Sequence, residues 1–310
     1  MLPRSATLIS AVLLIVMASC KKEESTQSNG GGGGTSSGTA DSNYLSKIIE
    51  VDTLGGTKDT VLLLQFNYDA AKRLTSLYDS ANKDVYQFYY NGTDTLPNKT
   101  TITDFAPGGI AYNVHHFYNG TRLVKDSLEY PSDTGTVLYN TKRYETSSFI
   151  YTGSLVITNR KSFSFNASTQ TRTISNTIDT CKLNGNNIVE YYNYNTVPTL
   201  RNTATLSYIT SPSPIAKLAA SYSFAPTELN YFKQPNWFLV PHNNNIDKWT
   251  ATEIQSPTTY LVDEYIAGDY TYNTAGYPLS SSTKLYYTKL PLTPRHIEVA
   301  IKRKYVYKAL

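Results

Sequence analysis

The 310-residue sequence predicts an all-β fold, in which serial long antiparallel β-hairpins form one curved or barrel-like sheet. Three observations predict it. Apolar and polar residues alternate along many segments, as expected of half-buried strands. Turn sequences such as Asn-Gly end these segments at similar intervals. The composition includes 27 Tyr and only 2 Met, with abundant Thr, Ser and Asn, a bias that favours pleated sheets over helices.

Residues 1–19 have the features of a secretory signal. Arg4 precedes an apolar run, Ala6 to Met17, that is too short to span a bilayer. The following small residues end at Cys20, and this stretch resembles the lipobox of bacterial lipoproteins. The resemblance implies removal of residues 1–19 and a diacylglyceryl group on Cys20, which would attach the chain to a membrane. The alternative is an ordinary signal peptide that contains a cysteine.

Residues 20–43 predict a flexible tether. They include the Gly30–Gly34 run among Ser and Thr and show no apolar periodicity. Such a composition behaves as flexible coil because it buries too little apolar surface to fold. The β domain is therefore expected to begin at Tyr44 and to continue to Leu310 as one unit.

The first hairpin sets the pattern for the domain. Leu62, Leu64, Phe66 and Tyr68 fall on one face of a predicted strand, a turn follows at 69–72, and a second strand runs from 73 to 77. Further turns are predicted at 91–92, 119–120, 152–153, 184–185 and 273–276. Asn-Gly supplies the positive φ angles that tight hairpin turns require. The intervals between the successive tyrosines Tyr68, Tyr90, Tyr118 and Tyr151 are 22 to 33 residues, which suits long strands in up-and-down order.

The hairpin rhythm breaks in an irregular segment at about 211–250, which contains several prolines and both tryptophans. Proline cannot donate to a strand ladder. One interpretation is a ligand-binding loop, with Tyr231, Phe232, Trp237 and Trp249 as candidate contacts, because aromatic rings stack on sugars and other aromatics. The other is a plug or cap of the sheet, with Phe232, Trp237 and Phe238 as core residues.

Charge and cysteine content exclude some classes of function. The formal charge of +4 is spread along the chain, without the clustered basic footprint of nucleic-acid binding. The basic residues 302–304 are expected to be a solvated strand face. With Cys20 lipidated, Cys181 has no disulfide partner, and we expect it to be buried, with Leu183 on the same strand face.

No local catalytic or metal-binding motif is present, so the sequence predicts a non-enzymatic protein without a cofactor or metal. His115 and His116 are adjacent and would point to opposite faces of a strand, and the same holds for Asp263 and Glu264. Tyr86, Phe88 and Tyr90 would share a face. Such aromatic ladders bind glycans, but they also stabilise sheets as cross-strand pairs, which is the interpretation favoured here.

A family resemblance follows from the first hairpin. The residues from Phe66 to Asp69, with Arg73, Leu74 and Leu77, resemble the YD repeat, F-x-Y-D-x-x-x-R-L. Together with the lipobox, the glycine tether and the Tyr-rich hairpins, they resemble a family of Bacteroidota lipoproteins described as porin-like in fold. Later turns replace the Asp with Asn or Thr and mostly lack the Arg. The resemblance implies a long, curved antiparallel sheet that is closed or nearly closed, and it carries over no catalytic residue.

The expected function is a lipid-anchored envelope protein that binds a glycan or an envelope protein, or supports an assembly. Alternatives are a carrier of a lipid or other apolar ligand and a glycan hydrolase. The expected location is the outer membrane, on the cell surface because Lys22–Glu24 resembles an export signal of Bacteroidota lipoproteins, or else on its periplasmic face. An inserted barrel is disfavoured by polar strand faces and by the terminal Lys308–Leu310.

Exported Bacteroidota proteins are O-glycosylated at Asp-(Ser/Thr)-apolar sequences, and five triplets of this chain resemble that pattern. The hydroxyl-bearing residues are Thr53, Thr60, Ser80, Thr95 and Ser127. The alternative is that Asp-Thr and Asp-Ser are simply good turn formers.

Overall fold

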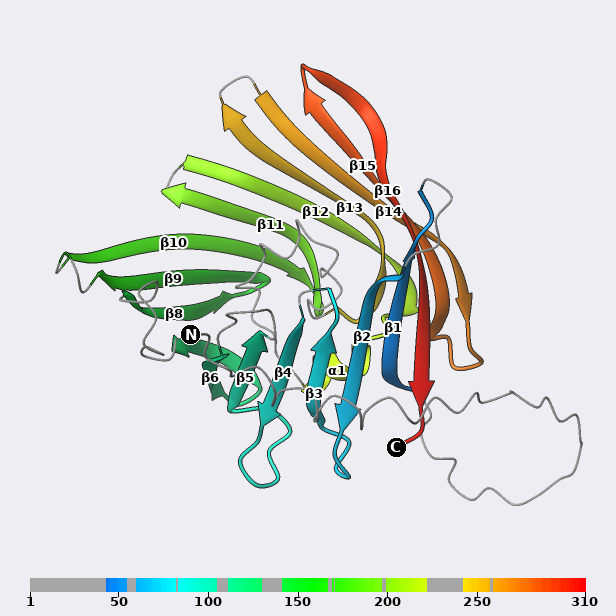
Figure 1. The fold of residues 1–310 in the computed structure, drawn as a ribbon, viewed down its shortest axis with the longest axis horizontal. Coiled ribbons are helices and arrows are strands. Elements are labelled where there is room, and N and C mark those ends of the chain that lie inside the picture. The colour runs from blue at the N-terminus through cyan, green and yellow to red at the C-terminus, as the bar shows by residue number, and fades with distance from the viewer. Residues whose placement is uncertain are drawn as a thin grey trace, which may run out of the picture. The chain divides into compact units, whose positions relative to one another are not determined.

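A computed structural model shows a closed, sixteen-stranded, antiparallel β-barrel, and confirms the predicted fold class (Figure 1). The structure describes residues 43–54, 60–81, 83–104, 111–129, 141–166, 169, 171–196, 199–221, 242–256 and 259–310. Each strand pairs with its neighbours in the sequence, and the first strand, β1, pairs with the last, β16. None of the helices in these residues is long and apolar enough to cross a membrane.

Most strands in the first half of the barrel are shorter than those in the second. The first half contains β1 (Tyr44–Asp52), β2 (Thr60–Tyr68), β3 (Leu74–Asp79), β4 (Asp84–Tyr89), β5 (Lys99–Asp104), β6 (Ala111–Asn119), β7 (Arg122–Glu129) and β8 (Thr141–Thr152). The second half contains β9 (Leu155–Asn166), β10 (Thr171–Asn184), β11 (Asn187–Thr196), β12 (Thr199–Pro212), the short helix α1 (Ala216–Ser221), β13 (Asn244–Ser256), β14 (Thr259–Tyr272), β15 (Pro278–Leu290) and β16 (Thr293–Lys308).

We name the two ends of the barrel by their connections. At the turn end, where the even-numbered strands finish, short turns follow β2, β6, β8, β10 and β14, whereas β12 is followed by α1; Tyr44 and Lys308, the two ends of the barrel's chain, also lie there. The predicted turn glycines occupy these turns with positive φ, for example 60° at Gly120 and 59° at Gly185. Residues with a Cβ rarely adopt this conformation, which explains why Gly recurs in the sequence. The opposite end is the loop end, where short connections occur too, for example between β15 and β16.

A tyrosine near the turn end of the even-numbered strands explains the repeated aromatic signal. Seven of these eight strands carry one near or just after their end, and each hydroxyl donates a hydrogen bond of 2.6–3.0 Å to a backbone carbonyl at or just before the start of the preceding strand. We call them the inter-hairpin tyrosines: Tyr68, Tyr90, Tyr118, Tyr151, Tyr208, Tyr270 and Tyr307. They join strands that the chain itself connects only at the loop end. On the eighth strand, β10, Leu183 takes this position.

β-Bulges explain why these carbonyls can accept a side chain. The register shifts beside several of the acceptor residues, including Leu45, Leu123 and Ile188. A bulge leaves a backbone group outside the strand ladder. The side chains of these three residues are buried, so a carbonyl without the tyrosine would lack a partner in a largely dry environment.

The structure shows what the YD-like residues of the first hairpin do. Phe66 and Leu74 are buried, and Tyr68 is an inter-hairpin tyrosine. The Asp69 carboxylate accepts hydrogen bonds from the backbone N–H and Nε of Arg73, at 2.9 and 2.8 Å. Arg73 also lies 4.6 Å from the centre of the Tyr90 ring and donates to the carbonyl of Gly92 at 2.7 Å. Arg73 thus links the turn of one hairpin to the turn of the next.

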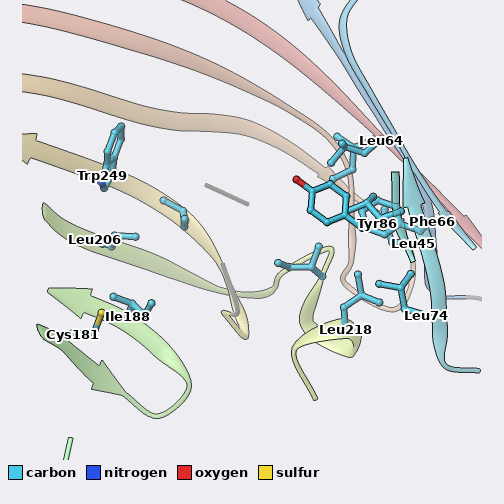
Figure 2. Close-up of a cluster of buried hydrophobic side chains, with 14 of the residues drawn as sticks. Leu45, Leu64, Phe66, Leu74, Tyr86, Cys181, Ile188, Leu206, Leu218 and Trp249 are labelled. Carbon is cyan, nitrogen blue, oxygen red and sulfur yellow. The ribbon is translucent and has the colours of Figure 1, made fainter. Parts of the chain in front are cut away.

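The interior of the barrel is filled near the turn end. Buried side chains from β1–β4 and from β10–β13 point into one hydrophobic cluster, and Leu218 of α1 belongs to it (Figure 2). Ser213 and Ile215, just before the helix, are also buried. The described beginning of the predicted irregular segment therefore packs inside the barrel. The segment is shorter than predicted, because β13 begins at Asn244.

Candidate functional site in the barrel interior

Of the four aromatic residues predicted as ligand contacts, only Trp249 lies within the described residues. Trp249 lies in β13 rather than in a loop, is 4 % exposed, and packs edge-on against Tyr265 with ring centres 6.3 Å apart. The pairing of Leu206 with Trp249 turns the indole toward the interior (Figure 2). Strand pairing therefore buries the ring, and its role as a ligand contact stays a prediction. Tyr231, Phe232 and Trp237 lie outside the described residues.

The predicted aromatic ladder of Tyr86, Phe88 and Tyr90 faces the barrel interior. Tyr86 and Phe88 are buried inside the barrel, Tyr90 is half-buried on the same face, and Tyr89 is exposed on the other. The alternation on β4 is thus confirmed, and the three inward rings belong to the core or pack against it.

Inward-facing charges lie above this apolar layer, toward the loop end. Glu50 of β1 and Arg303 of β16 are paired in register and are 0 % and 3 % exposed. The Arg303 guanidinium donates to Glu50 and to the hydroxyl of Tyr265, which in turn bonds Thr283 at 2.9 Å. Burial raises the pKa of Glu50, and the adjacent guanidinium opposes that rise. This buried pair closes the barrel between its first and last strands.

A second polar cluster lies on β8–β11. Arg160 is 3.1 Å from a carboxylate oxygen of Glu145 and 3.8 Å from one of Asp179. The amide of Asn193 donates to Asp179. Burial raises the pKa of Asp179, and the hydrogen bond and the guanidinium partly offset this. Cys181, two residues along the same face, is buried as predicted, and burial raises the pKa of its thiol. A thiol held neutral is a poor nucleophile and metal ligand.

A hydroxyl, an imidazole and a carboxylate form a line across β5, β6 and β7. The Thr100 hydroxyl is 2.9 Å from Nε2 of His116, whose Nδ1 is 2.8 Å from Asp126. The order resembles a nucleophile, a base and an orienting acid. Thr100, however, is 2 % exposed, so the geometry satisfies buried polar groups without presenting the hydroxyl to a substrate.

The two adjacent pairs of the sequence are split between the faces of their strands, as expected. His116 is inward, while His115 is outward and 4.0 Å from Glu129. Asp263 is inward, whereas Glu264 is outward between Lys248 and Arg295, at 2.5 and 2.7 Å. Across the described ranges, no cluster of three or more His, Cys, Asp or Glu side chains is arranged to hold a metal ion.

The inner face becomes accessible at the loop end. In β10, residues 171–176 are exposed on both faces of the strand, whereas Asp179 and Cys181 are buried. In β16, residues 294–298 are likewise exposed on both faces. The pairing of β10 with β9 places Thr173 and Ser175 on the same face as Asp179, toward the interior. The open part of the inner face is therefore hydrophilic on β10. The largely polar run at 171–177 could have indicated this open surface in the sequence, but the run alone does not say which residues face inward.

The predicted O-glycosylation residues differ in accessibility. Thr60 and Thr95 are exposed, and Thr95 lies in the turn between β4 and β5. Ser127 is half-buried within β7. The hydroxyl of Thr53 donates to the carbonyl of Ala300 at 3.2 Å, and that of Ser80 accepts from the N–H of Leu63 at 2.7 Å. Thr60 and Thr95 are thus the residues whose hydroxyls a modifying enzyme would reach most easily. Cys20 lies outside the described residues.

No protein-family model matches the chain, and no curated protein matches its sequence. Among solved structures, it is similar to a porin-like protein from Bacteroides vulgatus, with 11% identity over 87% of this chain and 100% of that chain and a TM-score of 0.47. It is also similar to a porin-like protein from Bacteroides uniformis, with 12% identity over 86% of this chain and 98% of that chain and a TM-score of 0.34. Because these scores are low, the fold rests on the strand pairing described above.

Proposed function

We propose that the chain is a lipid-anchored, non-enzymatic protein of the cell envelope whose barrel binds a hydrophilic partner at its loop end. The observation that carries the binding role is the change of exposure along β10. Inward residues near the turn end are buried, and those near the loop end are exposed and polar. Glycans and polar protein segments match such a surface. A carrier of an apolar ligand is less well supported, because buried side chains occupy the apolar half of the interior.

Two features support a barrel tethered to a membrane rather than inserted in it. Strands β3, β4 and β5 are six residues long each, and a strand needs about 9–11 residues to span a bilayer. The outward face also carries ion pairs between neighbouring strands, such as Lys182 of β10 with Glu190 of β11 at 2.8 Å. An inserted barrel instead presents an apolar band to lipid.

The anchor is tested by Cys20→Ala. Because this change removes the only proposed lipid attachment, we expect the variant to leave the membrane fraction, while wild type stays in it until detergent is added. Cys181→Ala is the matched control, since that thiol is buried inside the barrel. Retention of the Cys20→Ala variant in membranes at the wild-type level would contradict the lipoprotein assignment. Proteinase treatment of intact cells distinguishes the proposed surface location from a periplasmic one.

The binding role is tested with the mature Cys20→Ala chain on a glycan array. We expect Ser175→Trp to reduce binding to the recognised glycan at least tenfold, because a large ring on the inner face blocks the open end. Asn176→Trp is the control, since the neighbouring residue is equally exposed but faces outward. Equal effects of both variants, or of neither, would argue against binding at this face.

One observation supports the alternative that the protein is a glycan hydrolase. Glu253 of β13 and Asp263 of β14 both face inward and are diagonal neighbours in the register. Diagonal side chains lie about 7–8 Å apart, within the range of paired carboxylates in glycosidases. Release of reducing ends from a glycan bound on the array, abolished by Glu253→Gln or Asp263→Asn, would establish this activity and overturn the non-enzymatic assignment.

A further inference from the structure

Four lysines lie on the outward face where the barrel closes. The buried Glu50–Arg303 pair fixes which residues face inward on β1 and β16, so Lys302 and Lys304 face outward and are exposed. Lys47 of β1 and Lys284 of β15 are exposed on the same face. We call Lys47, Lys284, Lys302 and Lys304 the seam lysines.

The register places these four residues in a continuous diagonal line. Val306 pairs with Lys47, so Lys304 is diagonal to Lys47. Ser282 pairs with Lys302, so Lys284 is diagonal to Lys302. Diagonal neighbours in a sheet lie about 7–8 Å apart, within reach of long side chains. On β1, the half-buried apolar residues Ile49 and Val51 lie directly opposite Lys304 and Lys302.

The seam lysines differ from those outward cations of the barrel that are paired with carboxylates. Elsewhere Lys182 pairs with Glu190, and Glu264 lies between Lys248 and Arg295. Within the described residues, none of the seam lysines forms an ion pair of 4.0 Å or less. Asp269, a carboxylate on the neighbouring β14, accepts a hydrogen bond from Ser282 at 2.5 Å. The positive charge of this face is therefore available to an anionic partner.

The chain reaches this face directly from the proposed anchor. Residues 20–43 lead into β1, and Lys47 is its fourth residue. For the tether that the sequence predicts, a Gly/Ser-rich coil of this length would have a root-mean-square extension of about 27 Å. A lipidated Cys20 would therefore keep the seam lysines near the membrane at an effective concentration in the millimolar range. At such a concentration, even a weak contact between the seam lysines and the membrane would be occupied.

We propose that the seam lysines bind the anionic headgroups of the membrane that holds Cys20, and so determine which side of the barrel faces the bilayer. This inference rests on the proposed lipid anchor. Each lysine near an anionic surface strengthens binding about fivefold, and the attraction decays over a Debye length of about 10 Å at 0.1 M salt. The closing strands then lie toward the lipid, and the loop end remains accessible to a partner.

The test uses the mature Cys20→Ala chain, so that no acyl chain contributes. We expect it to sediment with sucrose-loaded vesicles of equal parts phosphatidylglycerol and phosphatidylcholine at 0.1 M salt, and to be released at 0.5 M. The triple variant Lys47→Gln, Lys302→Gln, Lys304→Gln is expected to bind about 100-fold more weakly. The control Lys125→Gln, Lys161→Gln, Lys182→Gln has the same net charge and removes exposed lysines from β7, β9 and β10. It should bind within about threefold of the parent chain.

Three results would overturn the proposal: no binding to the anionic vesicles, equal loss in both triple variants, or equal binding to pure phosphatidylcholine. Binding to dextran sulfate without binding to vesicles would assign the lysines to an acidic polysaccharide and also overturn it. Far-UV circular dichroism of each variant shows whether the barrel is folded. Failure here is distinguishable from failure of the anchor, which is measured separately by fractionation of the lipidated chain and its Cys20→Ala variant.

Discussion

The barrel is expected to unfold cooperatively when the pH is raised from 10 toward 12. Burial raises the pKa of the inter-hairpin tyrosines, to about 12 for Tyr90 and in the same direction for the other six. Below pH 10 the phenols are neutral in both states. Above it the unfolded chain loses these protons while the folded barrel keeps them, so the free energy of unfolding falls.

The size of this effect follows from the number of tyrosines. Each one contributes a slope of up to about 1.4 kcal/mol per pH unit once its unfolded form ionises. Seven such groups exceed the whole stability of a typical domain, about 5–15 kcal/mol, within about two pH units. The part of the tyrosinate absorbance that comes from the buried tyrosines should appear at the same pH as the loss of the far-UV circular dichroism signal. Early ionisation of all tyrosines in a still-folded barrel would contradict the buried hydrogen bonds.

Tyrosine-to-phenylalanine variants distinguish the contribution of the hydrogen bonds to stability from that of ring burial. Tyr208→Phe with Tyr270→Phe leaves two carbonyls without donors and should cost about 2–4 kcal/mol at pH 7. The same double variant has two fewer titrating phenols, so its loss of stability between pH 10 and 12 should be less steep. Tyr89→Phe is the control, because this ring faces outward and is exposed. Its urea unfolding curve should match that of the parent chain.

Arg303→Ala is expected to lower the free energy of unfolding by about 3–5 kcal/mol at pH 7, measured by urea unfolding. The change removes the guanidinium that opposes the raised pKa of Glu50, and leaves a carboxyl group buried without its cation. A carboxyl whose folded pKa is raised is destabilising above its unfolded pKa of about 4.3 and neutral in both states below it. The loss of unfolding free energy caused by Arg303→Ala should therefore become smaller as the pH is lowered toward 4.

A double variant checks that the deficit arises from the unpaired carboxyl. Glu50→Leu combined with Arg303→Met replaces the pair by apolar side chains of similar size, and such replacements are often neutral or stabilising. We expect it to recover most of the loss. If the double variant were as unstable as Arg303→Ala, lost packing rather than the isolated charge would be the cause. Lys302→Ala, on the outward face of the same strand, should change stability by less than about 0.5 kcal/mol.

The predictions that succeeded rest on local chemistry. Alternation predicted the inward faces of β4 and β10, including the buried Cys181, because a strand has a fixed period of two residues. Asn-Gly sequences predicted the turns at Gly120 and Gly185, because only local φ angles decide them. Nearby prolines suggested a loop around Trp249, which lies instead in β13. The strand containing it is fixed by pairing with β12 and β14, which the local sequence does not encode.

The sequence by itself determined the all-β class, the repeated hairpins, the turn positions and the recurring tyrosines, since each depends on residues within one hairpin. Only the tertiary structure decided that sixteen strands close, that the tyrosines bond carbonyls of the preceding strand, and that Glu50 meets Arg303. Those two residues are 253 positions apart, and each alone is an ordinary charged residue in a strand. Their partnership, like the line of seam lysines, depends on the register between β1 and β16, and that register is set by closure of the whole sheet.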